Sequence, residues 1–112
     1  ALVALPGSLV VRLTEARGVR VVLEAFADRA YTPDGGLVPR EAPGAVLADP
    51  EAIARRVVRL AADGVVPALD GSPVAVRAET VCVHGDTPGA VEVARAVRAA
   101  LTSAGVGVAS PL

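Results

Sequence analysis

Residues able to exchange protons follow two apolar segments of this sequence. Glu24 and Asp28 stand at and just beyond the end of VRVVLEAF, and His84 and Asp86 follow TVCV directly. Glu24 and Asp28 are four residues apart, so their side chains share a face if the strand extends that far. In barrels and open sheets of parallel strands, ligands bind at the carboxyl ends of the strands. We therefore predict that these four residues converge on one pocket at the same edge of a sheet.

The same residues also have purely structural interpretations, which the sequence pattern leaves open. His84 could cap a strand by hydrogen bonding, and Asp86 could cap the helix that follows it. Asp28 and Arg29 could form a surface ion pair, although a charged pair directly after a buried strand favours a site. Backbone N–H groups at Gly85 and at the helix start would suit a carboxylate or a phosphate.

Cys82 raises the question of a cysteine nucleophile paired with His84. The two residues are two apart, so on a strand they face the same way but stand roughly 6–7 Å from each other. That separation exceeds hydrogen-bond reach, and the flanking valines favour a packed core thiol. The histidine and the carboxylates together could hold a metal ion, but their spacing is not diagnostic of a metal site. Tyr31 and Arg40 lie in a long loop, where substrate contact and simple solvation are both open.

Alternating strands and helices would have to position these residues. We predict strands over 1–5, 19–26 and 79–83, helices over 9–16 and after Asp49-Pro50 and Thr87-Pro88, and a hairpin over 65–76 with a two-residue turn at Asp70-Gly71. Residues 28–44 form a long loop, and loops above about 12 residues in a compact domain are usually functional or disordered. This order predicts an α/β protein with parallel strands.

Helical spacing also predicts which faces of the two longer helices are buried. In the first of them, the apolar residues share one face and the arginines lie mostly elsewhere. In the second, a single apolar stripe runs along the helix. The predicted buried residues are Ile53, Val57, Leu60 and Ala61, then Val91, Ala94, Val97 and Leu101, and the arginines placed outside are Arg55, Arg56 and Arg59.

Composition excludes several classes of function. The 112 residues suffice for at most one ordinary domain, and a net charge of −1 without a basic stripe gives no support for nucleic-acid binding. No apolar run reaches the roughly 18 residues of a membrane-spanning helix. Lysine is absent, so the chain has no P-loop lysine. The single cysteine fits a reducing cytoplasm.

The start of the chain suggests part of a larger unit. ALVALPGS lacks an initiator methionine and has the pattern of a buried strand running into a helix start. Three parallel strands with helices on one side would leave the sheet edges open. A barrel that lacks its first half would explain both features.

The segments EAFADRAYTPDGGLVPR, PGAVLADPE and TVCVHGDTPGA, together with LPGS, resemble the LamB/YcsF family, the family of the 5-oxoprolinase A subunits. They occur in the family's order and spacing and cover nearly the whole chain. The resemblance implies a TIM-like (β/α) barrel of the glycoside hydrolase/deacetylase type. Residues 1–112 would be the C-terminal part of that single domain, because the family's N-terminal motifs, an Asp/Asn/Glu-rich strand and a CGFHAGD-like segment, are missing here.

The resemblance also implies an activity and its partners. The family opens 5-oxoproline (pyroglutamate) to L-glutamate with hydrolysis of ATP, working with 5-oxoprolinase subunits B and C. ATP would be a co-substrate, which a partner subunit could bind, and the number of copies in the assembly stays open. By position, the resemblance places Glu24, Asp28, Arg29, Arg40, His84 and Asp86 around the site, with Tyr31 as a further substrate contact.

Roles for these residues follow as hypotheses. Asp86 or Asp28 could act as a base or orient water, and His84 could shuttle a proton near neutral pH. Arg29 or Arg40 could pair with the substrate carboxylate or with a phosphate. Two other functions remain as alternatives: a metal-dependent, deacetylase-like hydrolase that works without ATP, and a non-catalytic scaffold that docks the partner subunits.

Overall fold

The computed structural model describes all residues, 1–112, and contains five short strands and three helices. Their order matches the predicted order of strand, helix, strand, long loop, helix, hairpin, strand and helix. The elements are β1 (Leu2–Ala4), α1 (Leu9–Glu15), β2 (Val21–Phe26), α2 (Pro50–Asp63), β3 (Val65–Pro67), β4 (Pro73–Ala75), β5 (Thr80–Cys82) and α3 (Ala90–Ser103).

The sheet that carries both polar clusters is parallel and has the strand order β1-β2-β5. In the β2–β5 register, Glu24 pairs with Thr80 and Phe26 pairs with Cys82. Paired residues point to the same face and successive residues alternate, so one face carries these four side chains. The mixed α/β architecture with a parallel sheet is therefore confirmed. The three strands do not by themselves form the closed barrel that the resemblance implies.

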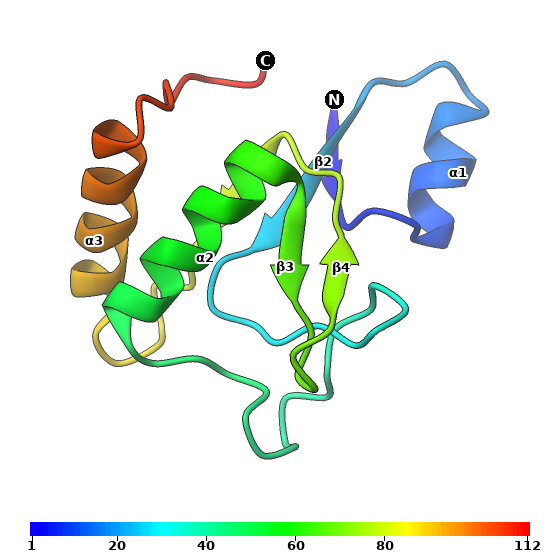
Figure 1. Cartoon of the computed structure of the whole chain (residues 1–112). Helices are drawn as coiled ribbons and strands as arrows, with labels where there is room; N and C mark the ends of the chain where they lie inside the picture. The colour runs from blue at the N-terminus through cyan, green and yellow to red at the C-terminus, as the bar shows by residue number, and fades with distance from the viewer.

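Helices α2 and α3 lie side by side and cover the opposite face of the sheet (Figure 1). Ile53 and Val57 of α2 pack with Val93 and Val97 of α3 over Ala27, which follows β2. A second cluster lies under the β3–β4 hairpin, which Figure 1 shows in front of β2; its buried residues are Ala25, Tyr31, Leu60, Val66, Ala68, Val74 and Val76. No helix is long and apolar enough to cross a membrane.

The start of α2 forms as predicted, but its buried face is wider than predicted. Asp49 is the N-cap, its carboxylate accepts from the Glu51 N–H at 3.2 Å, and Gly64 ends the helix in the left-handed conformation. Ala61 is exposed, contrary to the prediction, whereas Arg56 is buried. Arg56 lies three residues after Ile53, and that spacing keeps it on the covered stripe.

Helix α3 begins later than predicted, and its buried stripe is rotated. It starts at Ala90 after an N-cap glycine, not at Thr87-Pro88. Val93 and Val97 are buried, but Val91 is 58% exposed and Ala94 is also exposed, so the predicted stripe was wrong at Val91 and Ala94 and correct at Val97. The later helix start does not explain this error, because it does not change which residues share a face. The error arose because apolar residues occur on several faces of this helix, so its sequence allows more than one buried stripe.

The β3–β4 turn has three residues instead of the predicted two. Pro67 pairs with Pro73, and the Ala68 N–H donates to the Ser72 carbonyl, which leaves residues 69–71 in the loop. Gly71 has φ +86, the left-handed value that closes three-residue hairpin loops. Asp70 accepts from the backbone N–H and the hydroxyl of Ser72.

The predicted long loop is ordered by its own hydrogen bonds. The chain crosses back on itself, because Ala30 N–H donates to Ala45 and Leu47 N–H donates to Asp28, both at 2.8 Å. Ala30, Val38 and Ala45 form a small buried cluster within it. The loop therefore holds the segment that follows β2 in one conformation.

Candidate active site

The structure brings Asp28 and His84 together, although they are 56 residues apart in sequence. Nδ1 of His84 lies 2.7 Å from Oδ1 of Asp28, within hydrogen-bond distance. The Asp28 side chain is 5% exposed and the His84 side chain 20% exposed. A buried carboxylate thus holds a partly accessible imidazole.

The strand register explains why these two side chains meet. Asp28 and His84 lie two residues beyond the paired Phe26 and Cys82, so both return to the same face. The Ala27 N–H donates to the Cys82 carbonyl at 3.0 Å and continues the pairing past the end of the strands. The pair therefore lies at the carboxyl ends of two adjacent parallel strands, where ligands bind in such sheets.

The contacts of His84 orient its ring. A carboxylate only accepts hydrogen bonds, so Nδ1 carries the proton donated to Asp28 and the neutral ring presents Nε2 as an acceptor. The Phe26 ring meets the imidazole edge to face at 4.8 Å, with an interplanar angle of 88°. A carboxylate-held imidazole of this kind can act as a general base, and the Cys82 thiol is the protein group nearest to Nε2.

Glu24 and Asp86, the other two predicted members, lie apart from the pair. Glu24 is half-buried on the same face as Cys82 but makes no side-chain hydrogen bond or ion pair. Asp86 is exposed and does not cap the following helix, whose N-cap is Gly89. Asp86 therefore does not take the capping role that the sequence left open, because the loop runs three residues further before α3 begins.

Cys82 lies nearer to the histidine than the strand spacing suggested. Its Sγ is 4.0 Å from Nε2 of His84, less than the roughly 6–7 Å that separates residues two apart along a strand, because the distance between side-chain atoms can be shorter than the backbone spacing. Burial raises the pKa of the Cys82 thiol, and the charges of Glu24 and Asp28 raise it further. The thiol therefore stays protonated near neutral pH, which fits a packed thiol better than a nucleophile.

We expect Cys82 to react slowly with alkylating agents. The thiolate is the reactive form, so a raised pKa should make iodoacetamide labelling at pH 8 slower than labelling of free cysteine. Mass spectrometry of the labelled peptide over time measures this rate, and the rate should still rise between pH 8 and pH 10. Labelling of Cys82 as fast as free cysteine at pH 8 would contradict the protonated thiol.

The three predicted substrate-binding residues occupy different environments. Arg29 is buried and donates from Nη2 to the Val38 carbonyl at 2.8 Å, but its Nε has no partner. Arg29 and Asp28 do not form the surface ion pair considered above, since both are buried and point to different partners. Tyr31 is buried, and its hydroxyl accepts from the Phe26 N–H at 3.1 Å. Arg40 is exposed in the long loop.

Sequence reasoning missed Arg56 as part of this region. Its Nη1 donates to the Ala27 carbonyl at 2.8 Å and its Nη2 donates to the Arg29 carbonyl at 2.5 Å. The guanidinium also lies over the Tyr31 ring, 5.4 Å from its centre. The signal was available, because residues 53, 56, 57 and 60 have the spacing of one helix face.

The Asp28–His84 pair borders only a small hollow, and no cluster of metal-binding side chains surrounds it. Asp28 and His84 line a hollow of about 10 Å³, with room for about one water molecule. A larger hollow of about 360 Å³ lies between the β1–α1 turn, the loop 34–37 and the end of β4, and includes Tyr31 but neither Asp28 nor His84. No group of three or more His, Cys, Asp or Glu side chains is placed to hold a metal ion.

A parallel sheet with a carboxylate–imidazole pair at its carboxyl edge defines an α/β protein equipped for acid–base chemistry. The LamB/YcsF family model matches residues 1–112, and the chain belongs to this family. The family resemblance read from the sequence motifs is thereby confirmed.

Curated relatives share more than half of their aligned residues with this chain. A protein named as the A subunit of 5-oxoprolinase from Kocuria rhizophila is 56% identical over 109 residues, covering 97% of this chain and 43% of the relative. One of the same name from Thermus thermophilus is 57% identical over 107 residues, covering 96% and 43%. One from Mycobacterium avium is 63% identical over 90 residues, covering 80% and 36%. The chain thus spans less than half the length of these relatives.

A solved structure has the same fold. The crystal structure of a lactam utilization protein from Thermus thermophilus superposes with a TM-score of 0.90 at 54% sequence identity. The match covers 96% of this chain and 42% of that protein. The fold described above is therefore also present in part of that solved structure.

Proposed function

We propose that this chain is part of the A subunit of a 5-oxoprolinase, which opens 5-oxoproline to L-glutamate with hydrolysis of ATP. The observation that carries the proposal is the 2.7 Å Asp28–His84 pair at the carboxyl edge of the parallel sheet. The pair lies in a chain 56–57% identical to proteins named as the A subunit of 5-oxoprolinase. General acid–base catalysis is what an amide-opening reaction requires of such a pair.

The chemistry of the substrate explains the need for ATP. 5-Oxoproline is a five-membered cyclic amide, and amide carbons are poor electrophiles. Transfer of a phosphoryl group from ATP to the amide oxygen would make that carbon electrophilic. The balanced reaction converts 5-oxoproline, ATP and two waters to glutamate, ADP and phosphate.

Within this chain, His84 would move the proton. Its Nε2 takes a proton from the water that attacks the phosphorylated ring carbon, and it returns the proton to the ring nitrogen as the C–N bond breaks. The product of that step is an acyl phosphate, which the second water hydrolyses to glutamate and phosphate. Asp28 holds Nδ1–H, fixes the ring orientation and stabilises the imidazolium that forms in between. Of the candidate bases considered from sequence, His84 thus takes the role earlier open to Asp28 or Asp86.

Arg29 is our candidate for binding an anionic group of the substrate. Its guanidinium is buried, has no carboxylate partner and leaves Nε unpaired. A buried cation without a partner is costly unless a charged ligand compensates it. The carboxylate of 5-oxoproline or a phosphate fits this requirement, and the exposed Arg40 would approach from the long loop.

We further propose that the chain is the C-terminal part of a single (β/α) barrel domain. The sheet has open edges at β1 and β5, and the chain covers 41–43% of most of the first relatives in length. The remainder of the barrel would provide the other walls of the site. Subunits B and C of the enzyme would be partners, with ATP bound mainly by one of them, and the assembly would work in the cytoplasm.

A reconstituted enzyme tests the proposal. The full-length A subunit with its B and C partners should form glutamate and ADP in a one-to-one ratio from 5-oxoproline and ATP. Omission of the A subunit should abolish glutamate formation. Hydrolysis of the substrate by the isolated A subunit, without ATP and sensitive to a zinc chelator, would instead support the metal-dependent hydrolase. Full activity of a reconstituted enzyme whose A subunit carries His84→Ala would favour a scaffold.

A further inference from the structure

We propose that Arg56 is a positioning residue that holds Asp28 against His84 through the two backbone carbonyls on either side of Asp28. The inference comes from the geometry of the hydrogen bonds, and its activity test rests on the proposed function. Arg56 belongs to α2, far from either polar cluster in sequence. Neither the motifs nor the predicted helix faces pointed to it.

The hydrogen bonds of Arg56 frame Asp28 from both sides. Nη1 donates to the carbonyl of Ala27 and Nη2 donates to the carbonyl of Arg29, the residues before and after Asp28. A planar guanidinium can span two carbonyls at fixed separation, which an ammonium cannot do. The backbone at Asp28, whose own carbonyl accepts from the Leu47 N–H at 2.8 Å, is thereby also held at the carbonyls on either side of it.

The same guanidinium also supports Phe26, the aromatic ring that packs against His84. It lies over the ring of Tyr31, whose hydroxyl accepts from the Phe26 N–H. Phe26 in turn presents its ring to His84. Arg56 therefore supports both groups that contact the imidazole. It holds Asp28 through the flanking backbone and supports Phe26 through Tyr31.

Charge adds to this geometry. Arg56 is 7% exposed and burial lowers its pKa, while electrostatic interactions with Tyr31 and with the Asp28 carboxylate act in the opposite direction. The guanidinium is thus held near Asp28 both by its two carbonyl acceptors and by attraction to that carboxylate.

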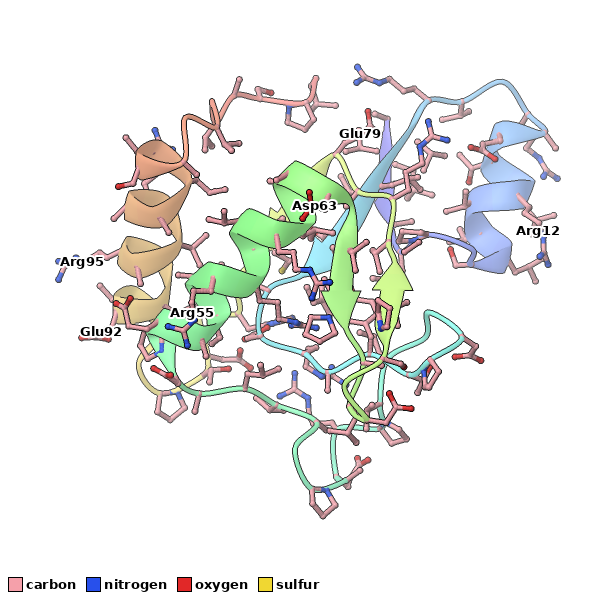
Figure 2. All side chains as sticks on the ribbon, in the orientation of Figure 1. Arg12, Arg55, Asp63, Glu79, Glu92 and Arg95 are labelled. Atoms are coloured by element: carbon pink, nitrogen blue, oxygen red, sulfur yellow. The ribbon has the colours of Figure 1, made fainter.

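The experiment compares Arg56 with its exposed neighbour. Arg55, the preceding residue on α2, is exposed at the outer side of the helix (Figure 2). In the full enzyme, Arg56→Met should lower kcat about 100-fold with little change in KM for 5-oxoproline, as expected when a reacting group is misplaced by about 1 Å. Arg55→Met should leave kcat unchanged. Arg56→Lys keeps the charge but not the two-carbonyl contact, so it should recover only part of kcat.

A double-mutant cycle separates positioning from general stabilisation. If Arg56 acts through the pair, Arg56→Met in a His84→Ala background should lower the remaining activity by less than about twofold. An equal fold-loss with and without His84, or an unchanged kcat in Arg56→Met, would overturn the inference. If Arg56→Met does not fold, Arg56→Lys is read in the same cycle.

A second readout keeps this inference distinct from the proposed function. If His84→Ala by itself leaves glutamate formation unchanged, the catalytic assignment of His84 fails. The positioning role is then tested by NMR of the His84 ring nitrogens in the folded subunit. Arg56→Met should weaken the Nδ1–Asp28 hydrogen bond and so change the chemical shift of Nδ1 relative to Arg55→Met, and an unchanged shift would exclude the positioning role.

Discussion

Replacing His84 by alanine is expected to lower glutamate formation by about 10²- to 10⁴-fold, the usual contribution of a positioned acid–base group. The enzyme tested is the full A subunit with its partners, at saturating 5-oxoproline and ATP. His84→Ala leaves the buried Asp28 carboxylate without its imidazole donor, so circular dichroism of the variant must show that the subunit is still folded. Rates of glutamate and ADP formation measure the effect.

Asp28→Asn should reproduce much of this loss. An asparagine side chain fills the same space but can present its amide N–H₂ to Nδ1, which would favour the wrong tautomer of His84. The matched control is Asp63→Asn, an exposed aspartate at the end of α2 (Figure 2). Loss of glutamate formation in Asp28→Asn with wild-type activity in Asp63→Asn is expected, whereas similar activity in both would remove the pair from the mechanism.

Ile53→Ala should be the most destabilising single truncation, costing about 2–5 kcal/mol in the free energy of unfolding. Ile53 is fully buried where α2, α3 and the end of β2 meet, and alanine would leave a cavity there. Ile53→Val removes one methylene and should cost about 0.5–1.5 kcal/mol. Urea unfolding of the subunit, followed by circular dichroism, measures both values.

The control for the core prediction is Val91→Ala on α3. Val91 is 58% exposed, and truncation of an exposed side chain usually changes stability by less than about 0.5 kcal/mol. An Ile53→Ala variant no less stable than Val91→Ala would mean that the α2–α3 interface is not the principal core. The comparison also tests the corrected phase of α3, since the sequence had assigned Val91 to the buried stripe.

Local signals in the sequence determined the elements and their order. Asp49 and Pro50 set the start of α2, and Gly64 set its end, because capping and left-handed backbone depend on neighbouring residues only. The apolar strands followed by Glu24, Asp28 and His84 likewise indicated where polar groups would emerge from a parallel sheet. These are short-range properties, which a single sequence contains.

Tertiary structure alone decided which side chains meet. Helical spacing defines possible stripes, but packing selected one on each helix: contact of α2 with the segment after β2 buried Arg56, and packing of α3 on α2 left Val91 exposed. The β2–β5 register, a pairing across more than fifty residues, brought Asp28 to His84 while the loop before α3 left Asp86 in solvent. Contacts of this kind depend on how elements distant in sequence pack against one another, and a local sequence pattern does not determine that packing.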